Sequence, residues 1–174
     1  MYNDIELHNV LFLAEPHIDE RTTSKNNTRK ENKDIAKYPF MVVEDIPFEI
    51  RFAFKGCQFT KEIILSDTIP AGYVYNMADI PFFLQPISYD KHSPFVRNAS
   101  LIHDYILEHK EELYKMWKLE EYGLDHRDFR ILSSDVFEVV LIQAGVPEKK
   151  ARLMRNSVDV FQKLVCWSWM GIDK

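Results

Sequence analysis

The sequence predicts an α+β domain, in which a small antiparallel sheet of three or four strands in the N-terminal half is packed by about four helices in the C-terminal half. Two observations lead to this fold class. Between Pro39 and Tyr75, apolar residues occur in short runs and at a period of two, as in half-buried strands. After Pro81 they recur at helical spacing. Strands first and helices after are typical of α+β proteins.

The strands are expected at 40–43, 48–55, 59–65 and 71–75. Residues 48–55 alternate most clearly, since Phe48, Ile50, Phe52 and Phe54 fall on one face. Connections this short favour an antiparallel meander.

Helices are expected at 96–110, 111–122 and 136–144, with a last helix after Pro147. Residues 136–144 have almost no polar side, so that helix should be buried. Gly145 stands where a helix C-terminal glycine belongs, and Pro147 falls near the first turn of the next helix.

The chain divides into an N-terminal arm with a mobile polar loop, residues 1–37, and a single α+β domain, residues 38–174. Residues 21–37 hold only two apolar side chains, too few to offset the entropy of ordering them. The arm has one apolar cluster, at 10–14. It forms either an edge strand of the same domain or a segment that docks on a neighbouring subunit.

The composition argues against several classes of protein. The chain has 174 residues, 46% of them hydrophobic, with a net charge of −5, which speaks against a nucleic-acid-binding partner. No apolar run is long enough for a membrane span, and we expect no signal peptide at Met1. The two cysteines are too few for a disulfide framework or a thiolate metal site, and we expect no metal or cofactor.

Among six histidines, His103 has the most suggestive context, because Asp104 follows it on a predicted helix. Neighbours on a helix point about 100° apart, so we expect no direct hydrogen bond between the two. Both can border one cleft, in which a neutral imidazole activates water and the carboxylate holds a cation or orients a substrate. The alternative is a partly buried histidine beside an exposed aspartate.

Two further groups have competing interpretations. Asp135 opens the expected helix at 136–144 and could face a cleft, but Asp135 and Glu138 also match the ends of a capping box. Trp167 and Trp169 lie beside the C-terminus and either close the core or anchor a partner.

Three blocks resemble a small family from bacteriophages and prophages, catalogued as domain of unknown function 1353. The segment IPAGYVYNMADIP at 69–81 is similar to its pattern P-A-G-F-x-x-D-G-A-S-I-P, and NASLIHD at 98–104 is similar to its A-A-x-x-H-D helix. Residues 133–146 resemble a third block, a helix of the form A-D-x-x-F that ends at A-G-V. The match covers about residues 45–165 and implies a phage-encoded protein.

The sequence departs from that pattern at chemically important places. Asn76 replaces an acidic residue, Asp79 stands where the family has serine, and the family's second-helix aspartate falls on Ser134, one residue before Asp135. The family pattern loosely resembles phospholipase A2, which would make His103 the base and Asp104 a calcium ligand, but the glycine-rich calcium loop is absent here. In a structural role, His103 and Asp104 would instead connect their helix to the 76–79 segment, with the imidazole facing the end of the 72–79 segment.

These observations predict a phage-encoded accessory or virion-associated protein that acts mainly through protein–protein contacts. Its partners would be other phage proteins or further copies of itself, in the virion or the host cytoplasm. The alternative is a hydrolase that uses His103, Asp104 and Asp135, impaired by the departures from the family pattern, with calcium as a cofactor only in this case. Asn76, Asp79, Trp167 and Trp169 are the expected binding residues. An inhibitor or decoy that binds a host factor is a third interpretation.

Overall fold

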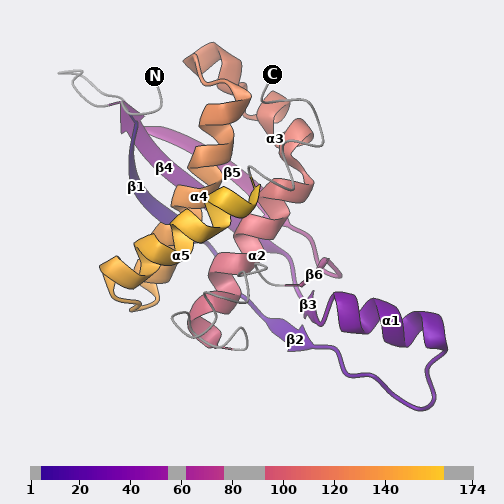
Figure 1. The fold of residues 1–174 in the computed structure, drawn as a ribbon. Helices are drawn as coiled ribbons and strands as arrows, with labels where there is room; N and C mark the ends of the chain where they lie inside the picture. Colours follow the sequence, from indigo (N-terminus) through magenta and orange to yellow (C-terminus); the bar gives the residue numbers. More distant parts are fainter. Residues whose placement is uncertain (1–4, 55–61, 77–92, 163–174) are drawn as a thin grey trace.

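The computed structural model describes residues 5–54, 62–76 and 93–162, and it has the predicted α+β layout (Figure 1). Two three-stranded antiparallel sheets are built from the N-terminal half, and four of the five described α-helices lie in the C-terminal half. The strands are β1 (Ile5–Phe12), β2 (Ile18–Glu20), β3 (Phe40–Val42), β4 (Ile46–Phe54), β5 (Ile63–Ile69) and β6 (Val74–Tyr75). The helices are α1 (Arg29–Lys37), α2 (Pro94–Glu108), α3 (Lys110–Met116), the 3₁₀ helix η3 (Leu119–Tyr122), α4 (His126–Gln143) and α5 (Glu148–Phe161).

The first sheet has the order β1-β4-β5, with the alternating strand β4 in its centre. Phe48, Ile50 and Phe52 are fully buried on one face of β4, as the period of two predicts. Ile50 is paired with Val10 of β1 and with Leu65 of β5. Of the two interpretations of the apolar cluster at 10–14, the structure therefore shows the edge strand of the same domain.

The second sheet, with the order β2-β3-β6, corrects the expectation of one meander. Strand β3 does not continue the first sheet, because its backbone N–H and C=O groups are hydrogen-bonded to β2 on one side and to β6 on the other. The Val42 N–H donates to Tyr73 O at 2.8 Å, and the Val43 N–H donates to His17 O at 2.9 Å. The Asp45 carboxylate then accepts from the Ala71 N–H at 2.8 Å, at the point where the chain passes into β4.

Helix α1 occupies the second half of the polar segment that we expected to be a loop. None of its residues is buried, so the segment is as poor in core contacts as its composition suggests. It is helical because local hydrogen bonds replace burial: Thr28 and Glu31 form a capping box at its start. Arg21 then anchors its end, through Asp34 at 2.9 Å and the Tyr38 carbonyl at 3.0 Å.

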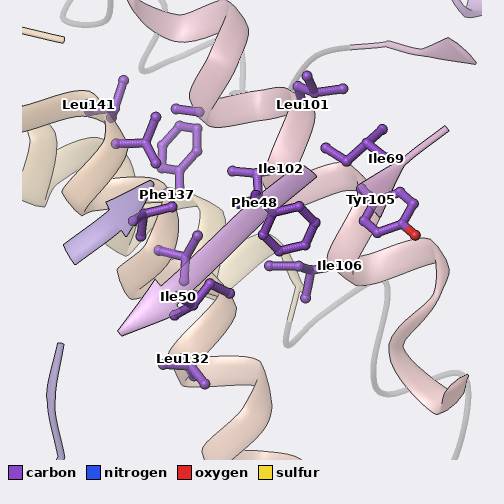
Figure 2. Packing of buried hydrophobic residues seen from close by; sticks show 14 of the residues in the cluster. Phe48, Ile50, Ile69, Leu101, Ile102, Tyr105, Ile106, Leu132, Phe137 and Leu141 are labelled. Atoms are coloured by element: carbon purple, nitrogen blue, oxygen red, sulfur yellow. The ribbon is translucent and has the colours of Figure 1, made fainter. Parts of the chain in front are cut away.

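The core lies between the first sheet and helices α2 and α4, which cover one face of it (Figure 1, Figure 2). The Phe48 ring meets the rings of Tyr105 and Trp117 edge to face, with centroids 6.0 and 6.4 Å apart. The labelled side chains of Figure 2 come from both sides of this interface: Phe48, Ile50, Ile69, Leu101, Ile102, Tyr105, Ile106, Leu132, Phe137 and Leu141.

Two polar groups of the helices, the Tyr105 hydroxyl and the Trp117 indole N–H, bind the edge strand β5. The Tyr105 hydroxyl donates to the Asp67 carboxylate at 2.8 Å and to the Thr68 carbonyl at 3.2 Å. The Trp117 indole N–H donates to the Ser66 carbonyl at 2.9 Å. Backbone groups at a sheet edge invite pairing with other chains, and these bonds cover part of that edge.

The C-terminal helices agree with the prediction except at two boundaries. The expected helix at 111–122 is broken after Met116 and resumes as η3. Helix α4 begins at His126 instead of near residue 136, because Asp125 and Asp128 form its capping box. Gly145, at φ +94°, follows the C-terminal end of α4, which confirms the predicted glycine stop. Among the described residues, no helix is long and apolar enough to cross a membrane.

Candidate functional site

A cluster of polar side chains, all buried except the partly buried Asp159, lies between α2, α4 and α5, and we call it the polar seam. It comprises His103 of α2, Arg130, Ser133 and Ser134 of α4, Asp159 of α5, and Gln162 just after α5. The two serines and Gln162 are completely buried. Buried polar groups are costly unless they are hydrogen-bonded, so their partners decide what the seam can do.

His103 is only 3% exposed, and each ring nitrogen has a partner. Nδ1 lies 3.3 Å from Oδ1 of Asp104, and Nε2 contacts the side-chain amide of Gln162. An amide N–H can only donate, so we assign the ring proton to Nδ1, where it donates to the carboxylate. The Phe137 ring packs against the imidazole with its centroid 5.5 Å away.

The contact between His103 and Asp104 contradicts our expectation for neighbouring helical residues. The 100° rotation separates the Cα–Cβ directions, but rotation about the side-chain bonds brings the two polar ends together. The Asp104 side chain is 12% exposed, so the expected exposed aspartate is also wrong.

Gln162 connects His103 to helix α4. Its carbonyl oxygen accepts from the Ser134 hydroxyl at 3.4 Å and lies equally far from the Ser133 hydroxyl, and its amide donates to the Ser133 hydroxyl at 3.3 Å. Ser133 also donates to the Arg130 carbonyl at 2.8 Å. Sequence reasoning missed Gln162, although it follows Met154 and Val158 at the four-residue spacing of the buried face of α5.

Ion pairs extend the seam along the contact of α4 with α5. Arg130 binds Asp159, and Asp135 binds Arg155 at 2.6 and 2.7 Å. Asp135 lies in the middle of α4, because this helix begins at His126, ten residues before the expected start at 136. The expected capping box of Asp135 with Glu138 is therefore wrong. Burial raises the pKa of Asp135 to about 6, although the Arg155 charge opposes the shift.

The structure brings together two of the three candidate catalytic residues, His103 and Asp104, and pairs the third, Asp135, with a cation from α5. The described contacts of the imidazole lie with α4 and Gln162 instead of with β6. Of the pair, Asp104 is the residue whose charge influences β6. Burial raises the pKa of Tyr75 in β6, and the negative charge of Asp104 raises it further.

Four residues were predicted to bind a partner. Asn76 lies directly after β6 and is half-buried. Asp79, Trp167 and Trp169 lie outside the described residues, so their predicted roles stay predictions.

Within residues 5–54, 62–76 and 93–162, no three His, Cys, Asp or Glu side chains are grouped as a metal site would require. Comparisons with protein-family models, with curated proteins and with solved structures each found no significant match.

Proposed function

We propose that this chain is a phage-encoded accessory or virion-associated protein that acts through protein–protein contacts, and that His103 and Asp104 belong to its scaffold. The observation that carries the proposal is the enclosure of the imidazole: it is 3% exposed and has Asp104 on one nitrogen and Gln162 on the other. The phage origin is supported by the resemblance at 69–81 and 98–104.

The chemistry of a general base supports this assignment. A base takes a proton from a water or substrate that lies within hydrogen-bond reach of its free lone pair. In His103 the proton is on Nδ1, and the lone pair of Nε2 accepts from Gln162. The hydrogen bonds around Gln162 favour one arrangement of the helices, because the buried side chains that they join would otherwise lack a partner.

One observation favours the hydrolase as a second candidate. Nδ1 of His103 faces the Asp104 carboxylate at 3.3 Å, and a carboxylate in this place fixes the tautomer and the orientation of a catalytic imidazole. Gln162 would have to leave Nε2 before a water could reach it. Calcium does not fit the described residues, because Asp104 is nearly buried and directed at His103.

The two functions differ in what happens when the imidazole is removed. We expect the His103→Ala chain to have a lower melting temperature than the wild type. We also expect that the wild type hydrolyses neither ester nor phospholipid substrates, with or without calcium. His17→Ala is the matched control, because the His17 side chain is 60% exposed, and we expect its melting temperature to stay unchanged. Hydrolysis by the wild type that His103→Ala abolishes at an unchanged melting temperature would overturn the proposal.

The location of the protein can be tested directly. Mass spectrometry of purified particles should find the chain at a constant ratio to the structural proteins if it is a virion component. A chain that is abundant in the infected-cell lysate and absent from purified particles would contradict the virion assignment, and would leave an accessory or host-directed role.

A further inference from the structure

The charge of this chain is unevenly distributed. Residues 21–37 contain six Lys and Arg against two Asp and Glu, a net charge of +4. Since the whole chain has a net charge of −5, all other residues together have a net charge of −9. A basic segment on an acidic protein can attract an acidic partner that the rest of the chain would repel.

Helix α1 arranges its cations on one face. At about 100° per residue, Arg29, Lys30, Lys33 and Lys37 all fall within an arc of about 100°. We call these four residues the basic stripe. Neither acidic residue of α1 neutralises it from within the stripe, because Glu31 caps the helix and Asp34 binds Arg21.

The stripe is available on the surface. Arg29, Lys30 and Lys33 are exposed, and within the described part of the chain they form no ion pair. Lys37 lies over the Tyr38 ring, 4.7 Å from its centroid. Helix α1 extends away from the helices that cover the first sheet (Figure 1) and buries none of its residues, so its outer face is open to a partner.

A complementary surface lies on α3, η3 and the turn that follows. Its exposed acidic residues outnumber its exposed lysines, Lys115 and Lys118. These acidic residues are Glu111, Glu112, Glu120, Glu121 and Asp125. Two large apolar side chains are exposed beside them, Met116 at 53% and Tyr122 at 42%. Exposed methionine and tyrosine next to charged groups are typical of protein-binding surfaces. We call this region the acidic surface.

We propose that the basic stripe of one copy docks on the acidic surface of a second copy. This inference rests on the proposed function, since it names the partner of a protein that acts through protein contacts. The two surfaces are different parts of the chain, so the contact is head-to-tail: the first copy keeps its acidic surface free, and the second copy keeps its basic stripe free. Such contacts produce rings if the rotation closes and filaments if it does not.

A second copy fits the stripe better than a nucleic acid does. Helix α1 is about 13.5 Å long and offers four cations, fewer than the six to ten phosphate contacts of a typical strong complex. A bound nucleic acid would also approach a body with a net charge of −9. The acidic surface of another copy matches the stripe in sign and adds the apolar contacts of Met116 and Tyr122.

The test compares two charge reversals in the full chain by sedimentation velocity, in about 0.05 M and about 0.5 M salt. One variant, Arg29→Glu with Lys33→Glu, removes the net positive charge of the stripe, and the other, Glu111→Lys with Glu120→Lys, removes the net negative charge of the acidic surface. We expect the wild type to associate in low salt and each variant alone to sediment as a monomer. An equimolar mixture of the two variants should associate again, because the unchanged acidic surface of the first variant then meets the unchanged basic stripe of the second.

The matched control reverses two exposed cations on α5, Lys149→Glu with Arg152→Glu, which changes the net charge as much as the stripe variant does. This control should associate like the wild type. A wild type that stays monomeric in low salt, or a mixture that fails to associate, would overturn the inference. So would a monomeric wild type that binds a single-stranded oligonucleotide through the stripe. If the chain is monomeric but is found in particles, the self-association inference is wrong and the proposed function is not affected. If the chain self-associates but is absent from particles, only the virion role is contradicted.

Discussion

Helix α4 has two sides of different chemistry. Towards the first sheet and α2 it presents apolar side chains such as Leu132 and Phe137, which pack on β4 (Figure 2). Towards α5 it presents Ser134, Asp135 and Arg130, each with a hydrogen-bonded or charged partner. The apolar side stabilises the fold in proportion to the apolar area that is removed from water, and this contribution does not depend on the orientation of individual groups. The polar side depends on direction, because a misplaced partner leaves a buried group unsatisfied.

The largest expected effect is on the apolar side. Phe48 is fully buried and touches two aromatic rings, so Phe48→Ala should lower the free energy of unfolding by about 3–5 kcal/mol. Denaturant unfolding measures this loss. The control Leu13→Ala, at a side chain that is 56% exposed, should change it by less than about 0.5 kcal/mol. Equal losses in the two variants would contradict the placement of the core.

The polar side should make stability depend on pH. The pKa of Asp135 is about 6 in the folded chain, above the ordinary value of 3.8, so the folded state keeps this proton to a higher pH than the unfolded state does. Its contribution is therefore present in full below about pH 4 and is lost as the pH rises to about 6, by at most about 3 kcal/mol.

Asp135→Asn should flatten this part of the profile, which is measured as the free energy of unfolding between pH 4 and pH 7. The slope is what is compared, because the substitution also puts an amide in place of the carboxyl group beside Arg155, which changes the stability by an amount that does not depend on pH. Asp19→Asn is the control, at an aspartate whose side chain is 64% exposed. A slope that both variants leave intact would mean that another group carries it.

Replacement of the hub of the polar seam should cost less than replacement of a core aromatic. Gln162→Leu nearly keeps the volume but leaves Nε2 of His103 and the Ser133 hydroxyl without their amide partner, at a cost of about 2 kcal/mol. The exposed Gln143 provides the control, Gln143→Leu, with an expected change below about 0.5 kcal/mol. A Gln162→Leu chain as stable as the wild type would show that the seam does not depend on this hub.

The smallest effect concerns the Tyr105 hydroxyl, one of the two polar groups by which the helices bind β5. Tyr105→Phe removes the hydroxyl that binds Asp67 and Thr68, and should lower the free energy of unfolding by about 1 kcal/mol. Tyr122→Phe, at a ring that is 42% exposed, should leave it unchanged. The same small change in both variants would mean that the edge of β5 is not held by this bond.

The same comparison explains which features could be predicted. Periodicity predicts β4 and the buried face of α5, because burial repeats with the geometry of each element. It does not predict a polar residue such as Gln162 on such a face, since its place depends on partners far away in the sequence. The start of α4 was missed because Asp128, instead of Glu or Gln, completes its capping box.

The N-terminal half was harder to predict than its apolar pattern suggests. The pattern shows that β3 is a strand, but its pairing with β2 and β6 depends on contacts across long stretches of chain. Helix α1 was missed because composition was weighed above the local hydrogen bonds of Thr28 and Glu31. Helix geometry alone does not predict the contact between His103 and Asp104, because rotation about the side-chain bonds decides where the polar atoms lie.

The enclosure of His103 is the central claim, and chemical labelling tests it most directly. Diethyl pyrocarbonate modifies accessible imidazoles, and mass spectrometry of the digested protein locates each modified residue. We predict that His109 is modified quickly in the folded chain, while His103 is protected until the chain is unfolded, because their side chains are 36% and 4% exposed. Modification of His103 as fast as that of His109 in the folded chain would contradict the account.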